Sequence, residues 1–122
     1  MPLSITIDAV NPHQLANFWA AALPGYQIRS YDKIEIDRLA AIGRTPRSDP
    51  SVAVDGEDPT LWFQEVAREA TGRNRLHFDL TYGPRDQEVS RLRDLGATIR
   101  DEREDHTVML DPEANQFCVF DP

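Results

Sequence analysis

The sequence has little cysteine and no excess of basic residues. Its 122 residues include one cysteine, Cys118, which excludes an internal disulfide and a cysteine-rich zinc site. The formal net charge is -8 at pH 7. An acidic surface repels phosphate backbones and anionic lipid headgroups, so we expect neither nucleic-acid nor membrane binding.

Long apolar runs are also missing. No stretch approaches the roughly 20 apolar residues that cross a bilayer. The first residues lack a basic region followed by an apolar segment, so we expect no signal peptide. Together with the single cysteine, these absences predict a cytoplasmic location.

What is present is the composition of a globular protein, with 40% hydrophobic and 28% charged residues. The length suits one domain with a real core. We therefore expect a single domain over 1–122, with one module at about 1–68 and a second at about 74–122.

Alternating and clustered apolar residues predict the strands of the first half. These strands are 3–10, 26–31, one within 34–42, and 60–66, and the loop-rich stretch 43–59 leaves room for a further short strand at 51–54. Between the first two, Asn11 is a candidate N-cap, and Pro12 occupies the first helical position, where its missing N–H costs nothing. The helix ends at Pro24 and Gly25.

The second half repeats this order. After a crossover at 67–74, its expected strands are 75–82, 97–103, 106–110 and 116–120. Pro84 opens a helix that ends at Gly96, with Val89, Leu92 and Leu95 on the buried face. A tight turn is expected at 111–115.

The halves can be overlaid, because Ile-Thr-Ile-Asp at 5–8 matches Leu-His-Phe-Asp at 76–79. A repeated unit that cannot bury its apolar face alone packs against its copy. The expected fold class is α+β. Two paired βαβββ modules, with eight strands and two helices, form a curved mixed sheet around a pocket.

Four segments resemble a known family. They lie at 7–23, 61–66, 74–80 and 107–119, and their most specific strings are Arg-Leu-His-Phe-Asp-Leu at 75–80 and Asp-Pro-Glu-Ala-Asn-Gln-Phe-Cys at 111–118. The sequence resembles a glyoxalase-like domain of the vicinal oxygen chelate superfamily, the glyoxalase/bleomycin-resistance/dioxygenase group. The resemblance implies paired βαβββ modules and a homodimer with pockets near its interface.

The resemblance also implies where metal-using relatives place their ligands, one on each of four strands. At these positions the sequence has Thr6, Gln64, His77 and Cys118. His77 is a good ligand and Gln64 a weak neutral one, whereas Thr6 and Cys118 depart from the pattern, which the resemblance draws from His, Glu and sometimes Gln. We therefore expect no cofactor, with a divalent metal held by His77 and Gln64 as the alternative.

His77 is the candidate catalytic residue. It alternates with Leu76 and Phe78, so it faces away from the core, and a histidine there suits acid–base work near neutral pH. A buried, hydrogen-bonded histidine is the other interpretation. The expected ligand-binding residues share strand faces with His77 or its counterparts; they are Thr6, Asp8, Trp62, Gln64, Asp79, Gln116 and Cys118.

Several of these residues have a second interpretation. Asp8 and Asp79 occupy matching positions and either orient His77 or cap strand ends. Trp62 either stacks on a ligand or packs. Cys118 is either a nucleophile with His77 as its base or a small pocket residue.

Three functions follow. The first is a small-molecule pocket protein without the usual metal, acting as a lyase or hydrolase through His77. The second is a non-catalytic, drug-sequestering binding protein of the bleomycin-resistance kind. The third is a divalent-metal-dependent lyase or dioxygenase. The sequence leaves open whether the protein is an enzyme.

Overall fold

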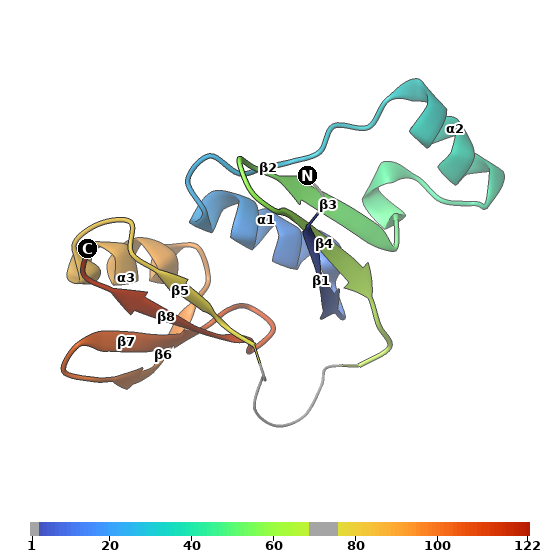
Figure 1. The fold of residues 1–122 in the computed structure, drawn as a ribbon. Helices are drawn as coiled ribbons and strands as arrows, with labels where there is room; N and C mark the ends of the chain where they lie inside the picture. The colour runs from blue at the N-terminus through green and yellow to red at the C-terminus, as the bar shows by residue number, and fades with distance from the viewer. Residues whose placement is uncertain (1–2, 69–75) are drawn as a thin grey trace. The chain divides into compact units, whose positions relative to one another are not determined.

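The computed structural model describes residues 3–68 and 76–122. The chain divides into two compact units, Met1–Glu69 and Ala70–Pro122. Each unit has its own four-stranded mixed sheet (Figure 1). Most of the crossover expected at 67–74, and the start of the strand expected at 75, lie outside the described residues.

The sheet of the first unit has the order β1-β4-β3-β2. Its strands are β1 (Ser4–Ala9), β2 (Gln27–Ile28), β3 (Ser51–Asp55) and β4 (Thr60–Glu65). β1 runs parallel to β4, and the other neighbours are antiparallel. Helix α1 (Pro12–Ala22) packs against β3 and β4. The strand expected at 26–31 is therefore real but shorter.

Helix α1 begins and ends as the sequence predicts. The Asn11 side chain accepts a hydrogen bond from the Gln14 N–H at 3.2 Å, and Pro12 follows at the first helical position. Gly25 ends the turn after the helix with φ +82°, a left-handed conformation that glycine adopts at no steric cost. The buried face of α1 includes Leu15, Phe18 and Trp19, which form the core with the sheet.

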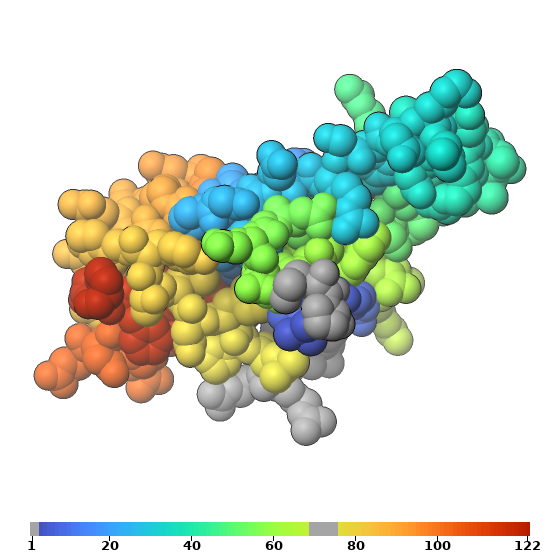
Figure 2. Space-filling view, turned by 45° about the horizontal axis from the view of Figure 1, so that its top comes forward, coloured from blue at the N-terminus to red at the C-terminus, as the bar shows by residue number. Residues whose placement is uncertain are grey.

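The strand predicted at 34–42 is wrong, because this segment is helix α2 (Lys33–Ala41). The alternation of Ile34 and Ile36 suggested a strand, yet both side chains are exposed, at 77% and 42%. Asp32 caps the helix by accepting from the Glu35 N–H at 2.8 Å. The buried residue of α2 is Leu39. Figure 2 shows α2 (cyan) projecting from the end of the first unit.

The segment between α2 and β3 contains a short 3₁₀ turn, η1 (Pro46–Ser48), where loops were expected. β3 confirms the short strand expected at 51–54, and β4 confirms the one at 60–66. α2 and η1 thus form an insertion between β2 and β3, and this insertion borders the candidate site described below.

The sheet of the second unit has the order β5-β8-β7-β6. Its strands are β5 (Phe78–Leu80), β6 (Thr98–Glu102), β7 (His106–Leu110) and β8 (Gln116–Phe120). β5 runs parallel to β8, and the other neighbours are antiparallel. This is the arrangement of the first unit, since in both a first strand pairs in parallel with the last. The expected α+β fold with repeated βαβββ modules is confirmed.

Helix α3 (Arg85–Asp94) packs against β6, β7 and β8 through Val89 and Leu92. The expected third member of this face, Leu95, is 37% exposed. That part of the prediction is wrong because the helix ends at Asp94. Leu95 is the C-cap, and Gly96, with φ +118°, turns the chain away.

The turn expected at 111–115 joins β7 to β8. The buried Asp111 side chain accepts hydrogen bonds from the N–H groups of Glu113 and Asn115, both at 2.9 Å. Ala114 has φ +64°, the left-handed region that a residue with a Cβ enters at a cost. The Asp111 side chain therefore adds to the backbone hydrogen bonds of this strained turn, which join Ala114 N–H to the Asp111 carbonyl and Asp111 N–H to the Asn115 carbonyl, both at 2.9 Å.

Among the described residues, no helix is long and apolar enough to cross a membrane.

Candidate functional site

Each sheet has one face covered by its helix and one open face. In the first unit, Leu61 and Phe63 are buried on the α1 side of β4, so Trp62 and Gln64 point to the other face. The strand register places Thr6 beside Trp62 and Asp8 beside Gln64. All four residues expected to bind a ligand in this unit therefore share its open face.

The same register recurs in the second unit. Asp79 of β5 pairs with Cys118 of β8, as Asp8 pairs with Gln64. The overlay of 5–8 on 76–79 is thus a structural repeat, in which Cys118 is the counterpart of Gln64. The expected site residues fall into two sets, one on the open face of each unit.

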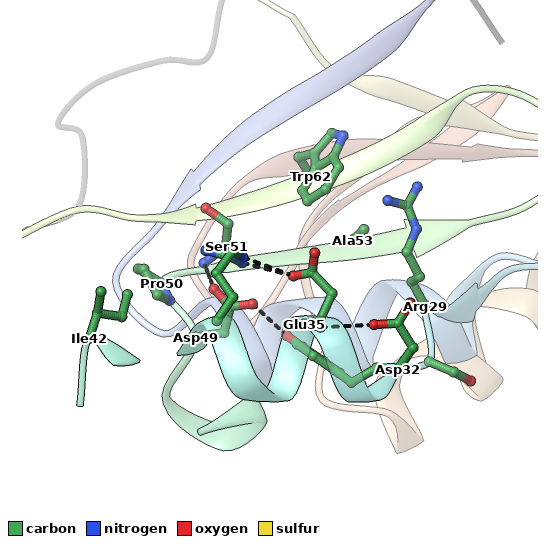
Figure 3. A pocket seen from close by; sticks show the side chains of 12 residues that line it. Arg29, Asp32, Glu35, Ile42, Asp49, Pro50, Ser51, Ala53 and Trp62 are labelled. Atoms are coloured by element: carbon green, nitrogen blue, oxygen red, sulfur yellow. Dashed lines mark hydrogen bonds and ion pairs between the residues drawn. The ribbon is translucent and has the colours of Figure 1, made fainter. Parts of the chain in front are cut away.

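A cavity of about 520 Å³ lies on the open face of the first unit. Trp62, Ala53 and Ser51 of the sheet form one wall with Arg29 at its edge, and Tyr31, Asp32, Glu35 and Arg38 form the side contributed by α2 and the residues before it (Figure 3). Volumes of this size suit small organic molecules. Trp62 was expected to line a pocket from the sequence, and it lines this one.

Arg29 is fixed between Trp62 and Asp55. Its Nε and Nη2 donate to the two oxygens of Asp55 at 2.7 and 2.9 Å, and its Cζ lies 5.0 Å from the centre of the Trp62 ring. The hydrogen bond from Arg29 holds the pKa of the Asp55 carboxyl below its ordinary value. The guanidinium therefore stays in place as a fixed positive group at the cavity wall.

Asp49 is a buried residue that also lines the cavity, next to Ser51. It accepts hydrogen bonds from the Tyr31 hydroxyl at 2.8 Å and from the Ser51 N–H at 3.0 Å. Burial, followed by the hydrogen bond to Asp49, raises the pKa of Tyr31. The Tyr31 hydroxyl therefore stays protonated over the physiological pH range, and it donates its hydrogen bond to Asp49.

Helix α2 contributes the outer charges of this cavity. Arg38 Nη2 lies 2.8 Å from Glu35 Oε2, one turn along the helix, and both residues line the cavity. The pair is exposed, so its contribution to stability is small. The sequence prediction missed Arg29, Tyr31 and Asp49. The signal that was available was the cap pattern of Asp32 followed by Glu35, which marks a helix rather than a strand.

The open face of the second unit brings together His77, Asp79 and Cys118. His77 Nε2 lies 3.3 Å from Asp79 Oδ1, and the ligand atoms of all three residues lie within 4.8 Å of one another. His77 and Asp79 are exposed, whereas Cys118 is buried. His77 lies beside Asp79. The placement of Leu76 on the core face is wrong, because Leu76 is 84% exposed. The catalytic role of His77 stays a prediction.

The environment of Cys118 disfavours its thiolate. Burial, and then the nearby Asp79 carboxylate, raise the pKa of the Cys118 thiol. A catalytic cysteine needs the opposite shift. The electrostatics thus favour the interpretation of Cys118 as a small pocket residue over that of a nucleophile.

Gln116 lies at the start of β8, where its side-chain oxygen accepts a hydrogen bond from Arg100 Nη1 at 2.6 Å. Both residues line a smaller cavity of about 200 Å³. On the same sheet, His106 pairs with Asp105 at 2.7 Å and stacks on Phe120, with ring centres 4.8 Å apart. Gln116 is therefore engaged within its own unit, and its ligand-binding role stays a prediction.

Comparison with known proteins identifies the family. A model of the glyoxalase-like domain matches residues 4–120. The chain therefore belongs to the glyoxalase-like domain family of the vicinal oxygen chelate superfamily, as the sequence resemblance indicated. Among curated proteins, none matches the sequence significantly.

Solved structures share the fold at low sequence identity. A glyoxalase/bleomycin resistance protein/dioxygenase family enzyme from Burkholderia phytofirmans is 18% identical, with a TM-score of 0.68 over 97% of this chain and 95% of that one. The fosfomycin resistance protein FosX from Mesorhizobium loti is 11% identical, with a TM-score of 0.69 over 100% and 91%. A FosX variant from Listeria monocytogenes, complexed with Mn(II) and 1S,2S-dihydroxypropylphosphonic acid, is 13% identical, with a TM-score of 0.65 over 96% and 86%.

Relatives with this fold thus include a protein that holds a divalent metal. At the four positions where the resemblance places metal ligands, this sequence has Thr6, Gln64, His77 and Cys118. None of the four is a carboxylate, and the two in the first unit are neutral and weak as ligands. These four residues do not fit the usual ligand set of the family.

Proposed function

We propose that this glyoxalase-like protein binds a small organic molecule in the cavity of its first unit. The observation that carries the proposal is the 520 Å³ cavity with the Trp62 ring on its wall and a fixed guanidinium, Arg29, beside that ring. An indole surface beside one oriented charge is a common way to bind a planar or partly aromatic ligand.

The cavity supports binding more directly than it supports chemistry. Its charged groups each have a partner: Arg29 pairs with Asp55, Arg38 pairs with Glu35, Asp49 accepts from the Tyr31 hydroxyl, and Asp32 accepts from the Glu35 N–H. Such pairs orient a ligand without a free base at the reacting position. This arrangement favours the binding protein among the sequence-based alternatives. The acid–base role of His77, the homodimer and the cytoplasmic location stay predictions.

The proposal is tested by a thermal-shift screen against mono- and bicyclic aromatic compounds that carry amine, carboxylate or neutral substituents. A compound that binds the folded state raises the melting temperature, by an amount that grows with its concentration. We expect hits whose shift is lost in Trp62→Leu, which removes the indole surface.

Tyr82→Ala is the matched control, because Tyr82 is an exposed aromatic residue of the other unit, 51% accessible. The same compounds should raise the melting temperature of this variant and of the wild type by the same amount. A screen without hits, or shifts that survive Trp62→Leu, would rule out the cavity as the binding site. Binding without turnover of any hit supports the binding protein over the enzyme.

A further inference from the structure

Three metal-binding side chains converge on the open face of the second unit from two neighbouring strands. Asp79 and Cys118 are register partners in the parallel pair of β5 and β8. His77 precedes Asp79 by two residues, and its Nε2 lies 3.3 Å from Asp79 Oδ1. The imidazole nitrogen, the carboxylate oxygen and the thiol sulfur all lie within 4.8 Å of one another.

These separations suit a tetrahedral metal ion. With metal–nitrogen and metal–oxygen bonds of about 2.0–2.2 Å and metal–sulfur bonds of about 2.3 Å, neighbouring ligand atoms lie roughly 3.3–3.7 Å apart. The nitrogen–oxygen separation already has this value. The sulfur needs to come closer to the other two atoms by at most roughly 1.1–1.5 Å, which side-chain rotation of the exposed His77 and Asp79 allows.

We propose that His77, Asp79 and Cys118 form a three-ligand site for zinc or a similar divalent transition ion. Imidazole and thiolate ligands select such ions over magnesium or calcium, which prefer oxygen. A cation there would also offset the electrostatic cost of a thiolate in a buried position beside Asp79. Three protein ligands leave the fourth coordination position to water or to an organic molecule.

The proposed set differs from the one that the family resemblance implies. It lies within one unit, takes no ligand from Thr6 or Gln64, and includes Asp79, which is not one of the four family positions. The first unit offers an internal comparison, because Asp8 and Gln64 have the register of Asp79 and Cys118 but supply neither an imidazole nor a thiolate.

Metal binding and acid–base catalysis by His77 exclude each other, because a nitrogen that coordinates an ion cannot also accept a proton. The inference is independent of the proposed ligand cavity, which lies in the other unit. Each proposal can therefore fail without the other.

The test is a titration of the whole purified, metal-free protein with Co²⁺, followed by absorption spectroscopy and competition with Zn²⁺. Since Cys118 is the single cysteine of the chain, a sulfur-to-cobalt charge-transfer band assigns it as a ligand without any mutation. We expect this band, together with the intense visible bands of tetrahedral cobalt, to saturate at one ion per chain and to disappear on addition of Zn²⁺.

Four variants locate the other ligands. Cys118→Ser should abolish the charge-transfer band. His77→Ala and Asp79→Asn should each weaken binding by more than the roughly 10- to 100-fold that loss of an outer-shell partner costs. Gln64→Ala should bind as the wild type does. His106→Ala is a second control, since His106 pairs with Asp105 in the same unit without a thiol.

The wild-type spectrum decides the matter even if a variant fails to fold. Absence of a charge-transfer band at saturating Co²⁺ would overturn the proposal. So would unchanged affinity in folded Asp79→Asn, or loss of binding in Gln64→Ala, which would point to the family ligand set instead.

Discussion

Helix α2 depends on its cap more than the other helices do, and this leads to a sharp prediction. The helix has nine residues, and Leu39 is its buried residue. Helices of this length are marginal in water without tertiary support. The Asp32 side chain supplies the acceptor for the Glu35 N–H at 2.8 Å. Replacing such a cap with alanine costs about 1 kcal/mol.

For Asp32→Ala we therefore expect the local opening equilibrium of α2 to rise about fivefold, the equivalent of about 1 kcal/mol. Native-state hydrogen exchange, read by mass spectrometry on peptides from 33–41, measures this directly. Exchange in α1 should change much less, because α1 opens only when the core of its unit does. Its buried face includes the fully enclosed Leu15.

Asp32→Asn is the matched control, since asparagine caps as well as aspartate but lacks the charge. It should restore most of the protection. Two results would refute the reasoning: unchanged exchange in α2 of Asp32→Ala, or an equal rise in α1 and α2. The second would mean that α2 unfolds only with the whole unit.

Three further predictions follow from single contacts. Arg29→Met removes the pair with Asp55 and the cation beside the indole ring, and it should cost about 1–2 kcal/mol in urea unfolding, less at high salt. Glu88→Gln should make the free energy of unfolding fall less steeply as the pH is lowered. The hydrogen bond from Arg91 lowers the pKa of Glu88 below 4.5, so this pair stabilises the native state above that pH, and the contribution, about 1 kcal/mol or less, is lost as pH falls through the lowered pKa. Ala114→Gly should raise the melting temperature, because relief of the left-handed strain at φ +64°, about 1 kcal/mol, outweighs the added entropy of the unfolded chain.

The sequence predicted those parts of the fold that depend on local signals. Asn11, Pro12 and Gly25 marked the limits of α1, and Asp111 marked the turn before β8, because caps and turns act over a few residues. The repeat at 5–8 and 76–79 predicted that the two units share one plan, while the register of their strands comes from the structure. In both, the first strand pairs in parallel with the last.

The secondary-structure prediction failed at α2, where a short strand-like alternation of apolar residues lies in a segment that forms a helix. Ile34 and Ile36 alternate as strand residues do, but no neighbouring strand buries them, and both stay exposed. The helix at this place has local causes instead, the Asp32 cap and the pairs of Lys33 with Asp37 and Glu35 with Arg38. A short apolar alternation is weak evidence unless a partner for its apolar face can be named.

This error also explains why only part of the candidate site was predicted. Strand alternation placed Trp62 and Gln64 on the face of β4 opposite the buried Leu61 and Phe63, because side-chain direction in a strand follows from period two. The other side of the cavity is formed by Tyr31, Asp32 and α2, and its position depends on α2 being a helix. A strand in its place would have added an edge to the sheet rather than a wall over its open face. The cavity is thus a property of the insertion, and specificity in this protein should change with residues of the insertion, such as Glu35, while the repeated modules stay the same.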